Sequence, residues 1–369
     1  MREGESPSSE WLTAVKLIDK PRILIIRTDR IGDVILSTPV VRALRCAVPE
    51  GYLGMMVRPE HRELVEGNPE LDAVILYDKN GSEKSWLGSL RFARRLRDHR
   101  FDTAIILHST NRVILVSWLA GIRRRIGYAR RLPWLLTDPV PYVKKQGDRN
   151  ELEYNLELLR RIGLDPSAGS ARDRQPFVPT TAAQEAKTAA FMKSNGLGDS
   201  APVVVLHPGA SCRSKRWPAR HFAAVGDFLS GRHGAKVVVI SGPGEEREGR
   251  AVVAAMRSRP VAALGTMSLG ETACLLKKAR CLISNDSGPV HLACAVGTPA
   301  VSIFGRWGGG LSPARWGPTS PGSVALHHDV GCRPCLAHDC TIGFVCLEAV
   351  TEEEVIAAAE HAAQFKTPF

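Results

Sequence analysis

The chain has 369 residues, of which 44% are hydrophobic and 24% charged, and its formal net charge is +11. This length suits two domains of ordinary size, each able to bury its own core. No stretch approaches the ~20 consecutive apolar residues that a membrane-spanning helix needs, and residues 1–20 lack the apolar centre of a secretory signal. Nine cysteines in such a chain favour a reducing compartment. We therefore expect a cytoplasmic protein.

The first motif follows a predicted strand of apolar residues at 22–27. Gly32 allows close backbone approach in the turn, and a helix is predicted over residues 34–46 from apolar residues at helical spacing. Asp33 would then stand at the carboxyl end of the first strand, which is where ligands bind in open α/β sheets. A carboxylate at a helix N-terminus is also a common structural feature. The turn alone is therefore compatible with a capping role or with a functional one.

Predicted strands alternate with helical patterns along the whole chain. The strands are expected at residues 23–26, 73–77, 103–107, 203–206, 236–240, 282–284 and 300–304. This alternation predicts the α/β class, with parallel sheets covered by helices on both faces.

The best candidate linker is a polar, proline-containing stretch at residues 165–181. We accordingly divide the chain into an N-terminal tail at 1–21, an N-terminal domain at 22–175, a C-terminal domain at 176–350 and a C-terminal helix at 351–369. The last helix follows the second domain, and we expect it to pack back across the seam between the domains.

Positive charge is concentrated in residues 81–150, which contain 15 lysines and arginines against 5 aspartates and glutamates. The clusters are Arg91, Arg94, Arg95 and Arg97 on a predicted helix, and then Arg123, Arg124 and Arg125. Such a segment should attract an anionic partner. No helix-turn-helix, RNA-recognition or zinc-finger pattern accompanies it, so we expect no nucleic acid. An anionic membrane carrying an acidic glycolipid fits better, and simple solubility is the alternative.

A second motif comes directly after the predicted strand at residues 203–206. The loop at 207–218 offers backbone amides at Gly209 and Ser211, the amine of Lys215 and two arginines, just before a helix predicted at 219–229. Solvated basic loops are common, so this loop indicates an anion site only in combination with other evidence.

The third motif, Asn285-Asp286-Ser287-Gly288-Pro289-Val290-His291, lies between a predicted strand at residues 279–284 and a predicted helix at 292–296. Small residues at a strand-to-helix turn leave backbone N–H groups free where the helix dipole favours an anion. A nucleotide diphosphate is the ligand that such a turn favours. The alternative is a plain N-cap turn, with Asp286 as the cap and Gly288 relieving a strained φ.

Four cysteines lie close together near the C-terminus: Cys332, Cys335, Cys340 and Cys346. Four thiols in so short a segment could hold a structural Zn²⁺ tetrahedrally, although their spacing only resembles the zinc-ribbon pattern. We predict a structural role for them, with or without metal.

Taken together, these motifs resemble one family. The blocks at residues 23–45, 206–222, 241–247 and 282–305 occur in the order seen in the lipopolysaccharide heptosyltransferases, glycosyltransferase family 9. The resemblance implies a GT-B fold, in which two Rossmann-like domains face each other across a cleft. It also implies that the N-terminal domain binds the acceptor and the C-terminal domain binds the nucleotide sugar.

The resemblance implies an inverting transfer of a heptose from ADP-heptose onto the lipopolysaccharide inner core, with no cofactor required for catalysis. Asp33 matches the family's catalytic base, and Lys215 its phosphate-contacting lysine. Glu246 lies where the family binds the donor ribose, with Glu245 as a competing alignment. The donor-binding residues that the resemblance implies are Gly209, Ser211, Lys215, Glu246, Asp286, Ser287, Gly288 and His291.

The same resemblance implies an anionic glycolipid acceptor and peripheral contact with the inner face of the inner membrane. The basic residues assigned to that side are Arg94, Arg95, Arg97, Arg123, Arg124 and Arg125. Three alternatives stay open: a family-9 transferase with another donor or glycan acceptor, a nucleotide-sugar epimerase of similar build, and a non-catalytic glycolipid-binding scaffold. Two departures from the family pattern are His108 after the third predicted strand and a glycine-rich loop at residues 306–310, which could act as a lid.

Overall fold

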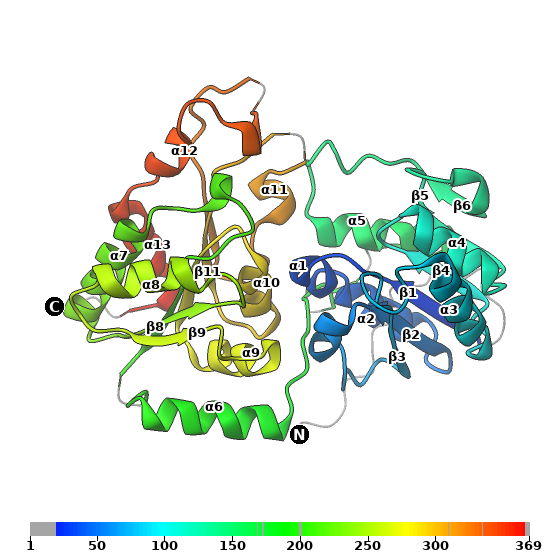
Figure 1. The fold of residues 1–369 in the computed structure, drawn as a ribbon, viewed down its shortest axis with the longest axis horizontal. Helices are drawn as coiled ribbons and strands as arrows, with labels where there is room; N and C mark the ends of the chain where they lie inside the picture. The colour runs from blue at the N-terminus through cyan, green and yellow to red at the C-terminus, as the bar shows by residue number, and fades with distance from the viewer. Residues whose placement is uncertain are drawn as a thin grey trace. The chain divides into compact units, whose positions relative to one another are not determined.

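A computed structural model describes residues 20–167, 169–171, 173–198, 201–308, 310–333 and 335–365. The chain divides into two compact units (Figure 1). Unit 1 comprises Met1–Lys144 and Glu151–Pro179, and unit 2 comprises Lys145–Asn150 and Thr180–Phe369. The predicted N-terminal tail lies almost entirely outside the described residues.

The boundary between the units differs from the predicted one in two ways. It falls after Pro179 rather than after residue 175, and residues 145–150 belong to unit 2 although unit 1 flanks them on both sides. Side-chain hydrogen bonds hold this short segment: Asn150 donates to the Gly317 carbonyl at 3.2 Å, and Ser312 donates to the Gly147 carbonyl at 2.8 Å. Contacts so distant in sequence leave no local signal, so the pattern of residues could not predict them.

Unit 1 contains a six-stranded sheet in the order β3-β2-β1-β4-β5-β6, and every pairing is parallel. The strands are β1 (Arg22–Ile26), β2 (Tyr52–Val57), β3 (Ala73–Leu76), β4 (Thr103–Ile106), β5 (Arg124–Tyr128) and β6 (Asp138–Val140). The helices are α1 (Ile31–Ile35), α2 (Thr38–Ala47), η2 (Pro59–Leu64), α3 (Trp86–Asp98), α4 (Asn111–Leu119), η3 (Pro133–Leu135), α5 (Glu151–Glu157) and η4 (Leu158–Ile162).

Unit 2 repeats this architecture with the strand order β12-β11-β10-β7-β8-β9, again all parallel. Its strands are β7 (Val203–His207), β8 (Lys236–Ser241), β9 (Val261–Leu264), β10 (Cys281–Asn285), β11 (Ala300–Ile303) and β12 (Val324–Leu326). Its helices are α6 (Ala182–Ser194), η5 (Arg213–Lys215), α7 (Ala219–His233), α8 (Glu246–Ala255), α9 (Leu269–Lys278), α10 (Gly288–Ala295), α11 (Pro313–Trp316), η6 (Ala337–Asp339), α12 (Val345–Glu348) and α13 (Glu352–Ala363).

All seven predicted strands are present, and the α/β class with two Rossmann-like domains is confirmed. The helix predicted at residues 34–46 is wrong as a single element, because it is divided into α1 and α2 at Leu36 and Ser37. Pro39 explains the break, since its ring has no N–H to donate to the Ile35 carbonyl and would clash with that carbonyl in a continuous helix. The Ser37 hydroxyl donates to the Asp33 carbonyl at 2.7 Å, which secures the junction.

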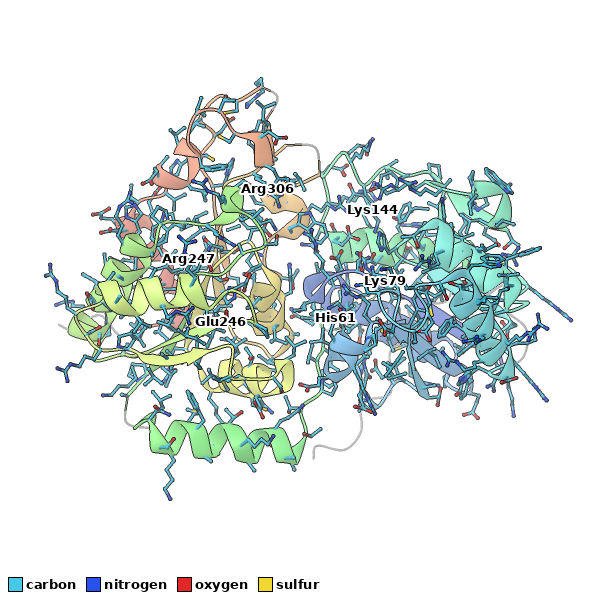
Figure 2. The ribbon with its side chains drawn as sticks, in the orientation of Figure 1. His61, Lys79, Lys144, Glu246, Arg247 and Arg306 are labelled. Atoms are coloured by element: carbon cyan, nitrogen blue, oxygen red, sulfur yellow. The ribbon has the colours of Figure 1, made fainter. Side chains whose placement is uncertain are left out.

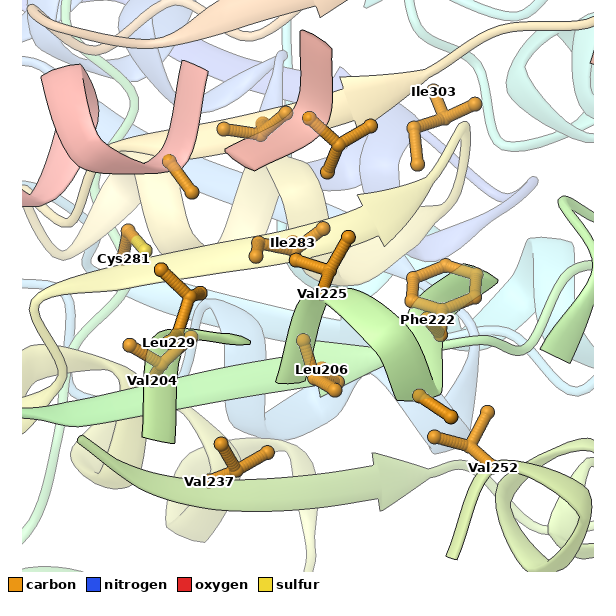
Figure 3. Packing of buried hydrophobic residues seen from close by; sticks show 14 of the residues in the cluster. Val204, Leu206, Phe222, Val225, Leu229, Val237, Val252, Cys281, Ile283 and Ile303 are labelled. Atoms are coloured by element: carbon orange, nitrogen blue, oxygen red, sulfur yellow. The ribbon is translucent and has the colours of Figure 1, made fainter. Parts of the chain in front are cut away.

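The core of unit 2 includes the last helix. Figure 3 shows apolar side chains of β7, β8 and β10, such as Leu206 and Ile283, packed against Phe222 and Leu229 of α7. Val355 and Ala359 of α13 belong to the same buried cluster. The helix is therefore part of unit 2 rather than a separate C-terminal segment. That it also packs back across the domain seam stays a prediction.

Each sheet has one topological switch point, where the strand order reverses. In unit 1 the switch lies between β1 and β4, and in unit 2 it lies between β7 and β10. Loops that leave neighbouring strands in opposite directions separate there and open a crevice at the carboxyl ends. The switch points therefore mark where functional side chains are expected. None of the described helices is both long enough and apolar enough to cross a membrane.

Candidate functional site

The switch point of unit 1 holds a buried cluster of charged side chains around Arg27. This residue follows β1, and its guanidinium contacts three carboxylates: Asp29 at 2.7 Å, Glu151 at 3.0 Å, and Asp33. Arg27 is only 2% exposed. A buried arginine needs such partners, because an unpaired charge away from water is very costly.

A second cation, Lys144, also belongs to the cluster, although it lies far from Arg27 in the sequence. Its ammonium group donates to Glu151 at 2.5 Å and to the side-chain oxygen of Asn155 at 3.1 Å, and it lies over the Tyr128 ring at 4.7 Å. Asn155 also receives a hydrogen bond from Arg27 and donates one to the Leu36 carbonyl. Helix α5 therefore positions the groups that hold Arg27, and through Arg27 it positions Asp33.

The environment of Asp33 changes its proton affinity. Burial and the negative charge of Asp29 raise the pKa of Asp33 to about 6, although Arg27 acts in the opposite direction. His108, which lies 3.4 Å from Asp29, has its pKa lowered to about 4 by burial and by the charge of Arg27. Near neutral pH, Asp33 is therefore an ionised carboxylate with an unusually high affinity for a proton, beside a neutral imidazole. That is the property that a general base requires.

Basic side chains border this cluster at the same edge of the sheet. Lys79, which follows β3, donates to the Thr28 carbonyl at 2.7 Å, and Arg112 at the start of α4 donates to the Lys79 carbonyl at 3.1 Å. Burial and the positive charge of Arg58 lower the pKa of Lys79. An anion bound beside Lys79, Arg58 and Arg112 would reduce the repulsion between their positive charges.

In unit 2, a chain of side-chain hydrogen bonds connects β7 to β10 at the switch point. His207 ends β7, and its Nδ1 atom lies 3.2 Å from the Ser284 hydroxyl and 3.1 Å from the Ser287 hydroxyl. Its Nε2 atom lies 3.3 Å from Glu245, and this hydrogen bond lowers the pKa of Glu245. A Cβ atom on Gly209 would clash with the same Glu245 carboxylate, so any other residue there would have to displace the Glu245 side chain.

Lys215 and Asp286 form a buried ion pair at this switch point. The ammonium group lies 2.7 Å from the Asp286 carboxylate and also donates to the Asp286 carbonyl at 3.0 Å. The Arg306 guanidinium approaches the same carboxylate at 3.4 Å. Burial lowers the pKa of Lys215, partly offset by Asp286. Two cations thus face one carboxylate, which leaves an excess of positive charge for an anionic ligand.

Trp217 and Asn285 fix the backbone that carries Lys215. The Trp217 backbone N–H donates to the Asn285 side-chain oxygen at 2.9 Å, and its indole N–H donates to the Val350 carbonyl at 3.0 Å. Asn285 in turn donates to the Pro208 carbonyl at 2.7 Å. The loop after β7 and the end of β10 are therefore held together, because the Asn285 side chain bonds to two residues of that loop.

Helix α10 begins at this point, four residues before the predicted start. Ser287 is its N-cap residue, and Gly288 and Pro289 form the first turn. Proline suits this position because its missing N–H is not needed there. The first N–H groups of the helix are directed away from its body, next to Asp286 and Lys215, so they reinforce the positive character of the site.

The structure brings together most, but not all, of the predicted donor residues. Gly209, Lys215, Asp286, Ser287 and Gly288 lie at the switch point of unit 2. His291 is buried one turn into α10, whereas Ser211 is exposed.

The two competing glutamates have different surroundings. Glu246 accepts hydrogen bonds from the Gly244 N–H at 3.0 and 3.1 Å, at the start of its own helix α8, and Glu245 is the carboxylate beside His207 and Gly209. Glu246 and Arg247 are labelled in Figure 2, at the start of α8. The assignment of Glu246 to a ribose stays a prediction.

The predicted basic residues of unit 1 divide into two groups. Arg124 pairs with Asp138 at 2.9 Å, and Arg125 donates to the Leu135 carbonyl at 2.6 Å, so both bind the β5–β6 region to its neighbours. Arg94 and Arg97 point outward from α3. The contacts of Arg124 and Arg125 show that these two residues have a structural role. The role in acceptor or membrane contact that was predicted for these arginines, Arg123 and Arg95 included, stays a prediction.

The four C-terminal cysteines line one cavity of about 180 Å³, together with Arg306 and Ser214. Cys346 donates to the Gly305 carbonyl at 2.8 Å, and Cys340 accepts from the Phe344 N–H at 3.3 Å. Within the part of the chain that the structure describes, no three His, Cys, Asp or Glu side chains are arranged to hold a metal ion. A structural zinc ion at these thiols stays a prediction.

Sequence reasoning missed several residues of both clusters. Arg27, Glu151 and Lys144 are not adjacent in sequence, and no motif joins them. Arg306 was predicted only as part of a glycine-rich loop, yet its side chain is 5% exposed and donates to the Asp286 carboxylate at 3.4 Å. Arg306 is labelled in Figure 2. An arginine within three residues of the end of a strand, as with Arg27 after β1 and Arg306 after β11, was the available signal.

The chain is similar to known glycosyltransferases. The family model described as glycosyltransferase family 9 (heptosyltransferase) matches residues 89–345. Lipopolysaccharide heptosyltransferase 2 of Escherichia coli (strain K12) is 25% identical over 294 residues, which cover 77% of this chain and 82% of that protein.

Two solved structures share the fold. The family 9 glycosyl transferase from Veillonella parvula DSM 2008 has a TM-score of 0.82 and 26% identity, covering 96% of this chain and all of that one. The E. coli ADP-heptose lipopolysaccharide heptosyltransferase II has a TM-score of 0.74 and 22% identity, with 93% and 98% covered. The chain therefore belongs to glycosyltransferase family 9 and is a glycosyltransferase of the GT-B fold.

Proposed function

We propose that this protein transfers a heptose from ADP-heptose onto the inner core of lipopolysaccharide, with inversion at the anomeric carbon. The observation that carries the proposal is Asp33, a buried carboxylate with a pKa of about 6 at the switch point of unit 1. Family membership supports the reaction class, and the name of the E. coli relative supports the choice of sugar and acceptor.

In the proposed reaction, the acceptor hydroxyl oxygen attacks the anomeric carbon of the donor. A bond forms between these two atoms while the bond from the anomeric carbon to the diphosphate oxygen breaks, and ADP leaves with the electron pair. The hydroxyl proton moves to the Asp33 carboxylate. Arg27 keeps Asp33 in place and stays protonated, so it cannot accept a proton itself. The three carboxylates raise the pKa of Arg27 well above its usual value, despite its burial.

The leaving diphosphate needs positive charge near its oxygens. Lys215, Arg306 and the first N–H groups of α10 supply that charge at the switch point of unit 2. Lys215 is bound to Asp286 in the free protein, and we propose that it turns towards phosphate when the donor binds. These cations do what a divalent metal does in other transferases, which supports transfer that requires no metal.

The acceptor side is proposed to bind an anionic glycolipid. Lys79, Arg58 and Arg112 place positive charge beside the Asp33 cluster, and a carboxylate or phosphate group on the acceptor would neutralise it. A lipid-linked acceptor also implies that the protein works on the cytoplasmic surface of a membrane. The glycine-rich loop that begins at Arg306 is proposed as a lid over the donor.

Transfer assays with a panel of donors test this function. ADP-heptose, other ADP-sugars and UDP-sugars are each supplied with and without a lipopolysaccharide core acceptor, in the presence and absence of EDTA. We expect product only with ADP-heptose plus acceptor, and equal rates with and without EDTA. Turnover of another nucleotide sugar would identify a different donor, conversion of the sugar without acceptor would indicate an epimerase, and binding without turnover would indicate a scaffold.

The pKa of Asp33 predicts the pH dependence of the reaction. Only the ionised carboxylate can accept the proton, so protonation below a pKa of about 6 removes the active form. We expect kcat/KM to be constant above that value and to fall by close to tenfold per pH unit below it. A profile that stays flat well below pH 6, measured where the protein is still folded, would contradict the role of Asp33.

A further inference from the structure

The outward surface of α3, α4 and η3 in unit 1 combines exposed tryptophans with arginines. Trp86, Trp118 and Trp134 are 58%, 48% and 76% exposed, and Leu87 is 61% exposed. Tryptophan is usually well buried, since its ring offers a large apolar area. Three of them on neighbouring elements are therefore an unusual feature of this surface.

These side chains belong to one continuous surface. Helices α3 and α4 pack against each other, and the Arg97 guanidinium at the end of α3 donates to the Leu119 carbonyl at the end of α4 at 2.8 Å. The η3 turn, which carries Trp134, packs against α4. In Figure 1, α3 and α4 lie together on the same side of the unit 1 sheet. We call this the α3–α4 surface, and it comprises Trp86, Leu87, Arg91, Arg94, Arg95, Arg97, Trp118 and Trp134.

The charge of this surface is strongly positive. Helix α3 contains four arginines and only one aspartate. Arg91 and Arg94 are exposed, and Arg95 pairs with Glu83 at 2.6 Å while remaining 64% exposed in its side chain. Arginine binds phosphate oxygens through a planar fork, and tryptophan prefers the boundary between lipid headgroups and acyl chains.

We propose that the α3–α4 surface is a membrane-docking face for an anionic phospholipid bilayer, in which the tryptophans enter the interface and the arginines bind lipid phosphates. The inference rests on the proposed function, because a lipid-linked acceptor lies at such a bilayer. A bilayer fits better than a small ligand because Trp86 and Arg97 are 11 positions apart on α3, which is about 16 Å along the helix. It fits better than a neutral protein surface because of the excess of arginine.

Vesicle sedimentation with the full-length protein tests the electrostatic part. We expect binding to vesicles of phosphatidylcholine mixed with phosphatidylglycerol, little binding to phosphatidylcholine alone, and a steep loss as salt rises. Replacing Arg94, Arg95 and Arg97 with Gln should weaken binding by about 10²-fold, since each basic residue near such a surface contributes about 1 kcal/mol. Activity on a lipid-linked acceptor should fall more than activity on a delipidated core sugar.

Tryptophan variants test the insertion. Trp118→Ser combined with Trp134→Ser should weaken vesicle binding several-fold and strongly reduce the quenching of protein fluorescence by brominated lipids, with Trp86 left to give the remaining quenching and turnover of a delipidated acceptor unchanged. Phe228→Ser is the matched control, because Phe228 is 41% exposed on α7 of unit 2 and should have no effect. A melting temperature equal to that of the parent protein confirms that the variants are folded.

Several outcomes would overturn the proposal. These are salt-independent vesicle binding, equal binding by the tryptophan variant and its parent, or a concentration-dependent dimer that the tryptophan variant abolishes. The last result would identify a second copy of this chain as the occupant. Failure of the proposed function would look different, because a protein without heptose transfer would still bind anionic vesicles through this surface.

Discussion

Asp33→Asn is expected to reduce turnover by ~10²-fold or more, as removal of a general base does, while folding and ADP binding stay nearly intact. Asparagine has almost the same shape as aspartate, so Arg27 and the backbone of α1 should keep their places. What is lost is the ability to accept the proton of the acceptor hydroxyl. Turnover on a core acceptor and calorimetry with ADP, measured on the same sample, would show this separation.

Asp29→Asn is the matched control for this experiment. Asp29 contacts the same guanidinium at 2.7 Å, so its replacement removes a carboxylate from the same cluster. Because the charge of Asp29 raises the pKa of Asp33, the control should move the acidic limb of the pH profile to lower pH with little loss of maximal turnover. Near-normal turnover by Asp33→Asn would instead give Asp33 a structural role as a partner of Arg27.

Lys215→Ala is expected to weaken binding of ADP far more than binding of AMP, and to leave adenosine nearly unaffected. The reason is that the ammonium group is proposed to meet the negative charge of phosphate, and a charged hydrogen bond of this kind contributes about 1.5–3 kcal/mol. Calorimetry with the three ligands should show a loss that increases with the number of phosphates.

Removing Lys215 also leaves Asp286 with Arg306 as its remaining cation, so the variant needs two checks. Lys215→Arg should restore part of the ADP affinity, because the positive charge returns. Lys236→Ala, at an exposed lysine in β8, should change none of the three affinities. An equal loss for ADP, AMP and adenosine would indicate a packing defect rather than a lost phosphate contact.

The sequence predicted those parts of the fold that have a local signal. Buried strands such as β1 and β7 are short runs of apolar residues, and the turns that follow them carry Asp33 and Lys215. Two of the strands that were missed, β5 and β6, contain charged residues or proline and lie next to the edge of the sheet and at the edge itself. Their pairing depends on contacts such as Arg124 with Asp138, which an apolar pattern does not record.

The candidate sites were predictable to a similar extent. Asp33, Lys215 and Asp286 could each be identified from a motif, because the residues of each motif are adjacent in the sequence. The partners that give these residues their chemistry come from far away: Glu151 is 124 positions from Arg27, and Asp286 is 71 positions from Lys215. The pKa of about 6 at Asp33 arises from burial and from neighbouring charges, and neither can be read from a motif.

The charge cluster around Arg27 has a consequence for the whole catalytic cycle. Two cations, Arg27 and Lys144, face the carboxylates of Asp29, Asp33 and Glu151, so the resting cluster has one unbalanced negative charge. Capture of the acceptor proton by Asp33 makes the cluster neutral. Electrical balance is thus reached only after sugar transfer, and loss of that proton to solvent restores the imbalance with which the next turnover begins.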